Sequence, residues 1–372
     1  MKTFFNLVQD VQKPGLCHRC GGCVTFCTAI NYGALALDED GKPYYSEMEK
    51  CIECGLCYAI CPEIDELEEE TRRNAAWSEP IGRVIETTVV QATEASVREK
   101  ATDGGAVTSL LLHLFDRGRI DGAIVAKPVG PFQRQPFLAT TRAQIQDAAG
   151  LYFDTSHGMQ HFSDQYMTFS SIEEFDPMVK KGLHRVALVG TPCQIKAVRR
   201  MQALGLVPAD SIQFCLGLFC SGNFTFGEEQ RDRLAKLAGI DWKDATGINL
   251  KDRLIITTGS GEQHTVPLEE LDFMKRFACR YCSDYAAEFA DISFGGIGAQ
   301  QGWTTVITRT PLGRAILADA RGTGCLDQFD IANDAEYASN ALQAVRVASA
   351  AKKKLARHQR REMAGKTVRF KE

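Results

Sequence analysis

The sequence predicts a protein of the mixed α/β (α+β) class, in which a short cysteine-rich module precedes a larger domain built on a mixed sheet. Eight of the fourteen cysteines lie between residues 17 and 61. From residue 84 onward, short β-branched and apolar runs alternate with stripes of helical period. Hydrophobic residues make up 44% and charged residues 24% of the 372 residues, which is ordinary for globular domains and excludes disordered, collagenous and coiled-coil proteins.

The expected elements divide the chain into four parts. Strands are expected at residues 86–91, 122–127, 184–190, 211–219, 253–258, 291–294 and 303–308, and helices at 107–115, 195–206 and 333–364. We therefore expect a cysteine-rich module at residues 1–65, an acidic linker at 66–85, a mixed-sheet domain at 86–345 and a basic helical tail at 346–372.

The cysteine count is unusual for an ordinary enzyme of this length. The first fourteen residues mix polar and apolar side chains and do not resemble a signal peptide. The longest apolar runs, at residues 109–115 and 214–220, are too short to cross a bilayer. We expect a cytoplasmic protein, in which many cysteines indicate metal sites rather than disulfides.

Charge is distributed unevenly along the chain. Residues 1–70 hold 13 acidic and 5 basic residues and carry −8, whereas residues 351–372 hold nine Lys and Arg and two Glu and carry +7. The acidic run that follows the module is expected to be a solvated helical or extended connector. The tail is expected to wrap the body as a solvated helix, and docking on an acidic partner or a membrane surface is the alternative. The acidic chain has no nucleic-acid-binding motif, so we expect no nucleic-acid partner.

Two runs near the N-terminus share the spacing C-x2-C-x2-C-x3-C, and the second ends in Cys-Pro. This is the spacing of bacterial ferredoxins, which carry two [4Fe–4S] clusters and pass single electrons. Three thiolates of a tight loop can face one cubane, while the fourth cysteine begins a helix that leads to the other cluster. Zinc knots are the alternative, but zinc sites prefer cysteine pairs separated by longer loops. The expected ligands are Cys17, Cys20, Cys23 and Cys61 for one cluster, and Cys51, Cys54, Cys57 and Cys27 for the other.

The later cysteines suggest a further site. Cys279 and Cys282 form a C-x2-C pair, while Cys193 and Cys220 follow predicted strands, whose ends can gather ligands at one sheet edge. Cys215 lies five residues before Cys220 on the same strand and therefore faces the opposite side. Spacing alone leaves two possibilities open, a third metal site, or buried free thiols together with a small zinc site.

A pair of glycines, Gly104 and Gly105, follows Asp103 and opens the predicted helix at residues 107–115. Glycine lets the backbone approach a ligand closely, and the free N–H groups at a helix N-terminus favour an anion. A glycine turn in which Asp103 caps the helix is the structural alternative. The glycine stretch at residues 295–298 is not G-x-G-x-x-G and does not indicate a Rossmann site.

Five segments of the body together resemble the β subunit of coenzyme F420-reducing hydrogenase. They run in order within residues 85–345, at 102–111 (TDGGAVTSLL), 189–194 (VGTPCQ), 217–224 (GLFCSGNF), 279–291 (CRYCSDYAAEFAD) and 302–309 (GWTTVITR). With the N-terminal module in front, the whole chain is similar to the electron-input subunit of reduced-F420 dehydrogenase complexes.

The resemblance implies bound FAD, a [4Fe–4S] cluster in the body and hydride exchange with the deazaflavin coenzyme F420. It places the body cluster on Cys193, Cys220, Cys279 and Cys282, and it leaves Cys215 and Cys325 without a role. It also places cofactor contacts at a set of residues within or beside the matching segments, namely Asp103, Gly104, Gly105, Thr108, Gly190, Thr191, Pro192, Asn223, Gly298, Trp303 and Arg309. For Thr108, Thr191, Asn223 and Arg309, a structural role is the alternative.

Three departures from the family pattern remove charged residues. Family members often have Gly-Thr-Lys-Tyr, Met-Glu-Asn-Phe and Pro-Asp-Gly-Trp where this chain has Gly-Leu-Tyr-Phe at 150–153, Ser-Gly-Asn-Phe at 221–224 and Gln-Gln-Gly-Trp at 300–303. Because coenzyme F420 is anionic, the missing lysine is expected to weaken its binding. The identity of the hydride carrier therefore stays open.

The expected cofactors suggest an oxidoreductase subunit that exchanges electrons between coenzyme F420 and a partner protein or larger redox complex. A flavin can exchange electrons in pairs or singly, so FAD is expected between a hydride carrier and the clusters, without a nucleophilic or general-base side chain. Membrane contact is expected only through partners. The alternatives are another hydride carrier such as NAD(P)H, an organic substrate reduced at the flavin by ferredoxin electrons, and a relay without a flavin.

Overall fold

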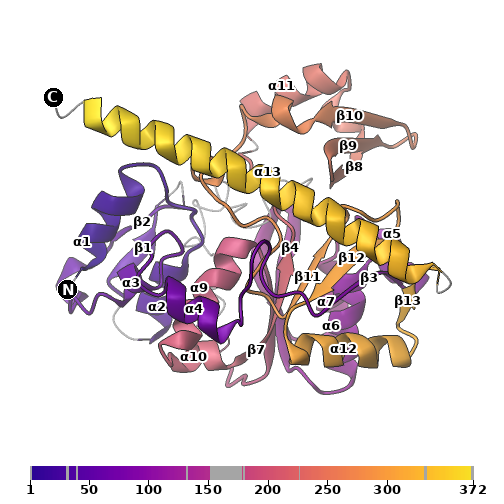
Figure 1. Ribbon diagram of the computed structural model, residues 1–372, viewed down its shortest axis with the longest axis horizontal. Helices are drawn as coiled ribbons and strands as arrows, with labels where there is room; N and C mark the ends of the chain where they lie inside the picture. Colours follow the sequence, from indigo (N-terminus) through magenta and orange to yellow (C-terminus); the bar gives the residue numbers. More distant parts are fainter. Residues whose placement is uncertain are drawn as a thin grey trace.

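A mixed sheet forms the centre of the molecule (Figure 1). The computed structural model describes residues 2–30, 33–38, 41–130, 133–150, 178, 181–225, 227–330 and 333–369. Within these residues the sheet has eight strands. Their order across the sheet is β13 (Leu326–Gln328), β3 (Glu86–Ala92), β12 (Thr304–Thr308), β11 (Ile292–Gly295), β7 (Ile212–Leu218), β6 (Val186–Gly190), β4 (Gly122–Gly130) and β5 (Gln133–Ala139).

The four central strands of this sheet run parallel, and the flanking strands are antiparallel. Strand β7 pairs in parallel with β11 and β6, and β6 pairs in parallel with β4. The remaining pairs are antiparallel. The carboxyl ends of β11, β7, β6 and β4 therefore meet at one edge, where ligands commonly bind in α/β sheets.

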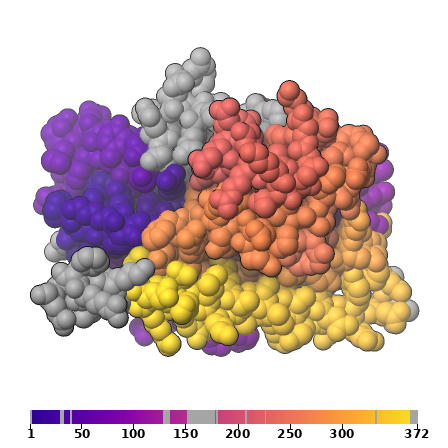
Figure 2. All heavy atoms as spheres, turned by 90° about the horizontal axis from the view of Figure 1, so that it is seen from above, coloured from indigo at the N-terminus to yellow at the C-terminus, as the bar shows by residue number. Residues whose placement is uncertain are grey.

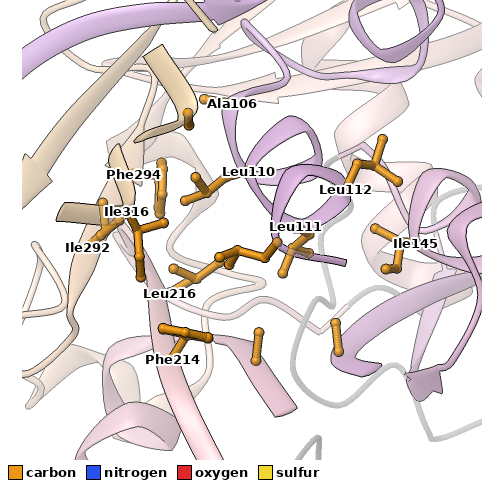
Figure 3. Close-up of a cluster of buried hydrophobic side chains, with 14 of the residues drawn as sticks. Ala106, Leu110, Leu111, Leu112, Ile145, Phe214, Leu216, Ile292, Phe294 and Ile316 are labelled. Atoms are coloured by element: carbon orange, nitrogen blue, oxygen red, sulfur yellow. The ribbon is translucent and has the colours of Figure 1, made fainter. Parts of the chain in front are cut away.

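Helices cover both faces of the sheet because its strands carry apolar side chains on both sides. On β7, Phe214 and Leu216 face one core while Cys215 faces the other, as the two-residue period of a strand requires. Figure 3 shows Leu110 and Leu111, which belong to the same core as Phe214 and Leu216, beside these and other sheet side chains. The first core packs against α6 (Ala106–Asp116), α7 (Arg142–Asp147) and α12 (Pro311–Gly322), with α5 (Ala95–Lys100) beside them, and the second packs against α9 (Pro192–Ala203) and α10 (Val207–Asp210).

The N-terminal module packs onto the second face of the sheet. Phe26 and Ile60 of the module share a buried core with Ile195 and Val198 of α9. The module has its own small core around Phe4, and its elements are α1 (Phe4–Leu7), η1 (Val8–Gln12), α2 (Gly22–Ile30), the antiparallel hairpin of β1 (Leu35–Leu37) and β2 (Pro43–Tyr45), η2 (Met48–Lys50) and α3 (Leu56–Ala59).

The acidic stretch after the module is not simply a solvated connector. It forms α4 (Glu68–Asn74), which contacts α9. The Glu68 carboxylate lies 2.9 Å from the guanidinium of Arg200, which is fully buried, and 2.6 Å from the Lys196 ammonium. Arg200 also donates to the carbonyl of Cys61. The expectation of solvated charges is therefore wrong for Glu68, because its partners come from a helix more than 120 residues later.

A small subdomain interrupts the body between β7 and β11. Strands β8 (Ala245–Leu250), β9 (Arg253–Thr258) and β10 (Gln263–Pro267) form a separate antiparallel sheet in the order β10-β9-β8, with α11 (Glu228–Ala238) packed on it. Three short 3-10 turns, η4 (Trp242–Asp244), η5 (Leu268–Leu271) and η6 (Phe277–Arg280), complete this region. The strand predicted at residues 253–258 is present, but it lies in this sheet and not in the central one.

The final helix, α13 (Asp334–Arg369), joins the two ends of the molecule. At 1.5 Å per residue its 36 residues span about 54 Å. It packs on β3 and extends to the N-terminal module, and Figure 2 shows it along one flank of the surface. The helix predicted at residues 333–364 is present, and it is longer. Within the part of the chain that the structure describes, no helix has the length and apolar character needed to cross a membrane.

Arg309 ties the end of the linker to the sheet. Its side chain is 1% exposed, and burial lowers its pKa to about 10. The guanidinium donates to the Ser293 hydroxyl at 2.6 Å and to the carbonyls of Ile81 at 2.7 Å and Ala286 at 2.9 Å. These contacts give Arg309 a structural role.

We expect Arg309→Met to lower the free energy of unfolding by about 3 kcal/mol, because several buried carbonyls lose their donor. Denaturant unfolding of the purified protein measures this loss. Arg314→Met, at an exposed position of α12, is the matched control and should leave stability unchanged. A normal unfolding midpoint for Arg309→Met together with loss of a bound cofactor would contradict the structural role.

Candidate functional site

The eight N-terminal cysteines form two groups that each border a cavity. Cys61 of the second run joins the first three thiols of the first run around a cavity of about 30 Å³. Cys27 of the first run joins the first three thiols of the second run around a cavity of about 110 Å³. We call these the inner group, which comprises Cys17, Cys20, Cys23 and Cys61, and the outer group, which comprises Cys27, Cys51, Cys54 and Cys57.

The backbone of the two cysteine loops explains this geometry. Arg19 and Gly21 of the first loop have positive φ, and Glu53 and Gly55 repeat the pattern in the second loop. Such turns direct successive backbone N–H groups inward and create a concave anion site. The N–H groups of Arg19 and Gly22 donate to the sulfurs of Cys17 and Cys20.

Burial dominates the electrostatics of both groups. It raises the pKa of the Cys57 thiol to about 12, and the neighbouring thiols Cys54, Cys27 and Cys51 add to the increase. Burial also raises the pKa of Cys23. Thiolates are the metal-binding form, so a bound cation would supply the charge compensation that these sites need.

The four cysteines predicted for a site in the body approach one another at the carboxyl edge of the central sheet. Cys193 lies in the first turn of α9, directly after β6, and Cys220 follows β7. Cys279 belongs to η6, and Cys282 follows that turn. Cys220 interacts electrostatically with Cys279 and Cys282, and Cys193 interacts with Cys282. We call these four thiols the body group.

The surroundings of the body group suit thiolate ligands. The backbone N–H of Asn223 donates to the Cys279 sulfur at 3.3 Å, and the Thr191 hydroxyl lies 3.3 Å from the Cys193 sulfur. Burial raises the pKa of Cys220 to about 11. Burial alone would also raise the pKa of Cys279, but a hydrogen bond from His18 and its charge lower it to about 7. This donor set fits a [4Fe–4S] cubane, because four sulfurs, one buried (Cys279) and three half-buried, lie among backbone and hydroxyl donors.

The remaining two cysteines lie elsewhere. Cys215 is fully buried on the opposite face of β7, where Arg199 and Asp291 are its charged neighbours. The Cys325 thiol contacts the carbonyl of Ala320 at 3.2 Å. Among the described residues, no three His, Cys, Asp or Glu side chains are arranged around a single metal ion. A cubane has a different requirement, because its four thiolates bind four separate iron atoms.

His18 connects the inner group to the body group. It follows Cys17 in the first cysteine loop and is 7% exposed. Its Nε2 atom lies 2.5 Å from the Glu63 carboxylate, and the ring also hydrogen bonds with Cys279. Cys20 of the inner group is an electrostatic neighbour of Cys193. The inner group is therefore adjacent to the body group.

A cavity of about 240 Å³ lies beside the body group, at the carboxyl ends of β6, β7 and β11. The first turn of α6 forms part of its wall. Gly105 is the N-cap of this helix, with φ of +71° and no capping side chain, so the helix N-terminus is open to a ligand. Cys220 belongs to the cavity wall and to the body group alike. Six of the predicted cofactor contacts line the cavity, namely Asp103, Gly105, Thr108, Gly190, Thr191 and Asn223.

The other predicted contacts are outside the cavity wall and make structural contacts. The Gly104 N–H donates to the Thr304 hydroxyl at 3.1 Å. Gly298 has φ of +79°, and a Cβ there would lie 2.7 Å from Ala341 of α13. Trp303 packs edge-on against Phe329. Pro192 occupies the first turn of α9, and Arg309 binds the carbonyls described above. Gly150 borders the cavity, but residues 151–153, where the family lysine is missing, lie outside the described residues.

Several cavity residues were not predicted from the sequence. The Asp103 carboxylate accepts a hydrogen bond from Asn249 at 2.9 Å and pairs with Lys251 at 3.1 Å. These two residues lie at the end of β8 and beyond it, in the small subdomain, and no sequence motif marks them. Gln194 also lines the cavity, and the matching segment VGTPCQ contains it.

Among the residues that the structure describes, two buried polar atoms of the cavity wall have no hydrogen-bond partner. The Gln194 side chain is 2% exposed, and its Oε1 atom accepts from the Thr191 N–H at 2.9 Å, but its Nε2 atom is unpaired. The Ser221 hydroxyl is likewise buried without a partner. Because an unsatisfied buried donor is costly, both atoms point to a polar ligand in the cavity.

Comparison with known proteins gives consistent matches. Residues 87–162 and 183–334 match the N-terminal and C-terminal parts of the coenzyme F420 hydrogenase/dehydrogenase beta subunit, and residues 9–62 match a 4Fe-4S dicluster domain. The coenzyme F420 hydrogenase subunit beta of Methanothermobacter thermautotrophicus is 30% identical over 66% of this chain and 85% of that protein. A coenzyme F420-dependent sulfite reductase of Methanocaldococcus jannaschii is 27% identical over 83% of this chain, which spans only 46% of that protein.

A solved structure also matches. A chain of the F420-reducing [NiFe] hydrogenase complex from Methanosarcina barkeri aligns with a TM-score of 0.66 and 27% identity, over 77% of this chain and 94% of that one. The ordered body motifs, the paired cysteine runs and these matches lead to one conclusion: the chain belongs to the coenzyme F420 hydrogenase/dehydrogenase beta subunit family and carries a 4Fe-4S dicluster domain at its N-terminal end.

Proposed function

We propose that this chain is an oxidoreductase subunit that exchanges electrons between coenzyme F420 and a partner protein, with FAD and three [4Fe–4S] clusters bound. The observation that carries the proposal is the position of Cys220, which lines the large cavity and belongs to the body group. A flavin in this cavity would therefore adjoin a cluster. When bound, FAD supplies exchange of electrons in pairs or singly, and the clusters supply single-electron exchange.

The cavity residues suit a flavin dinucleotide. The open N-terminus of α6 favours the negative charge of a pyrophosphate, and the Asp103–Lys251 ion pair lines the same cavity. The unpaired Gln194 Nε2 and Ser221 hydroxyl can donate to polar ring atoms. Apolar side chains such as Phe219 and Tyr285 exclude water from the same space.

The thiol groups suit a chain of three clusters. We assign the body group as ligands of a third cluster, because its four sulfurs are buried or half-buried and lie close together, and Cys279 and Cys193 have N–H and hydroxyl neighbours. The inner group adjoins it through His18, and Cys57 of the outer group is an electrostatic neighbour of Cys23 in the inner group. Beside the outer group, Ile52 is 57% and Met48 is 64% exposed, so the electron-transfer partner is proposed to dock there.

Coenzyme F420 is the hydride carrier that the relatives favour, because both named relatives and the aligned complex are described with F420. The alternative is another carrier such as NAD(P)H, or an organic substrate reduced at the flavin. The residues 150–153, Gly-Leu-Tyr-Phe, favour this alternative, because they lack the lysine that would meet an anionic carrier. None of the fourteen cysteines forms a disulfide, which supports the proposed cytoplasmic location.

A titration of the anaerobically purified protein tests the function. We expect reduced coenzyme F420 to bleach the flavin absorbance near 450 nm, whereas NADH and NADPH should leave it unchanged. Bleaching by the pyridine nucleotides alone would make the F420 assignment wrong. Isolated protein without any flavin band would instead favour an electron relay without a flavin.

Counting iron tests the third cluster. We expect twelve iron atoms and one FAD per chain, and we expect Cys279→Ser to retain eight iron atoms because only the body group loses a ligand. Cys325→Ser is the matched control and should retain twelve, since this thiol lies outside all three groups. Eight iron atoms in the unsubstituted chain would remove the third cluster from the proposal.

Substitution of Gln194 tests the flavin contacts. Gln194 and Gln230 have the same capping-box position at the starts of α9 and α11, but only Gln194 lines the cavity. We expect Gln194→Met to weaken FAD binding roughly 5- to 10-fold, the worth of about one hydrogen bond, as measured by reconstitution of the flavin-free protein. Gln230→Met should bind FAD normally. Equal losses in both variants would mean that helix capping, and not ligand contact, explains the effect.

A further inference from the structure

Helix α13 places the side chain of Lys352 at the edge of the body group. The Lys352 ammonium donates to the carbonyl of Cys220 at 2.6 Å and to the carbonyl of Asp284 at 2.8 Å. These two carbonyls belong to the separate segments that carry Cys220 and Cys282. Lys352 thus bridges both sides of the four-thiol site with a single charged group.

Among the described residues, the Lys352 ammonium forms no direct ion pair, although the Asp284 carboxylate interacts with it electrostatically. The next residue, Lys353, lies 2.7 Å from the Glu288 carboxylate, and Arg360 lies 2.7 Å from that of Glu63. Among the described residues, no carboxylate lies within ion-pair distance of Lys352. The thiols that interact electrostatically with it are Cys282, Cys220 and Cys279.

The other charged groups around this site are few. The Lys275 ammonium also lies near Cys279 and Cys220, and its pKa is lowered by burial and by the charge of Lys352. His18 hydrogen bonds with Cys279, and the carboxylate of Asp284 accepts from the Glu288 N–H at 3.1 Å. Arg360 also donates to the backbone of a body-group segment, at the Tyr281 carbonyl (3.2 Å), but its guanidinium pairs with Glu63.

We propose that the positive charge of Lys352 raises the reduction potential of the cluster held by the body group. The inference rests on the proposed function, since it requires the third cluster. Reduction adds one negative charge to a cluster, and a nearby fixed cation in a poorly hydrated site stabilises that added charge. A higher potential makes this cluster a better acceptor for electrons arriving from the cavity side.

A redox titration followed by electron paramagnetic resonance tests this role on the complete, cofactor-loaded chain. We expect Lys352→Met and Lys352→Gln to shift one cluster to lower potential while the signals of the other two stay in place. Lys352→Arg keeps a cation and should restore the potential. Lys354→Met removes the same charge from an exposed position of the same helix and should cause no shift.

The outcomes separate this inference from the function on which it rests. Twelve iron atoms with an unchanged potential in Lys352→Met would overturn the role of Lys352 and leave the third cluster intact. Loss of four iron atoms in both Lys352→Met and Lys352→Gln would also overturn it, because the lysine would then be a structural brace. Eight iron atoms in the unsubstituted chain would instead overturn the proposed third cluster.

Discussion

The buried carboxylate of Glu63 holds together the parts of the molecule that carry the thiol groups. It follows Cys61 directly after Pro62, and it binds His18 of the first cysteine loop and Arg360 of α13. Burial alone would raise its pKa, but the charges and hydrogen bonds of His18 and Arg360 lower it to about 2. One anion thereby fixes the inner group against the body group, and the electron path that we propose depends on this contact.

The central sheet supplies the second requirement, a fixed edge at which distant segments meet. Its parallel strands end side by side, so the first turn of α9, the segment after β7 and the glycine turn after β11 reach the same cavity. Gly217 is one condition for this arrangement, because a Cβ there would lie 2.4 Å from that of Ala287. The chain between Cys282 and β11 can therefore pack directly on β7.

Local patterns in the sequence predicted the local structure, but they did not predict contacts between residues that lie far apart in the sequence. Cysteine spacing anticipated which thiols approach one another, since a tight loop is a local feature. Apolar periodicity anticipated seven strands and three helices, but it missed β5, β8, β10 and β13 and the helices α7, α11 and α12. Pro136 and Gly247 weaken the strand patterns of β5 and β8. Glu68 looked solvated and Arg309 looked like a cofactor contact because their partners lie far away in sequence. Asn249 and Lys251 were missed for the same reason.

The reach of α13 has a consequence for the order of biosynthesis. The two N-terminal cysteine runs leave the ribosome before the body and form a module with its own small core. The contacts of Lys352 and Arg360 come from the last part of the sequence, yet they meet Cys220, Tyr281 and Glu63. Domains generally fold as units from the N-terminus during synthesis. The environment of the body group is therefore completed only after Lys352 and Arg360 have been translated, about 300 residues after the two cysteine runs.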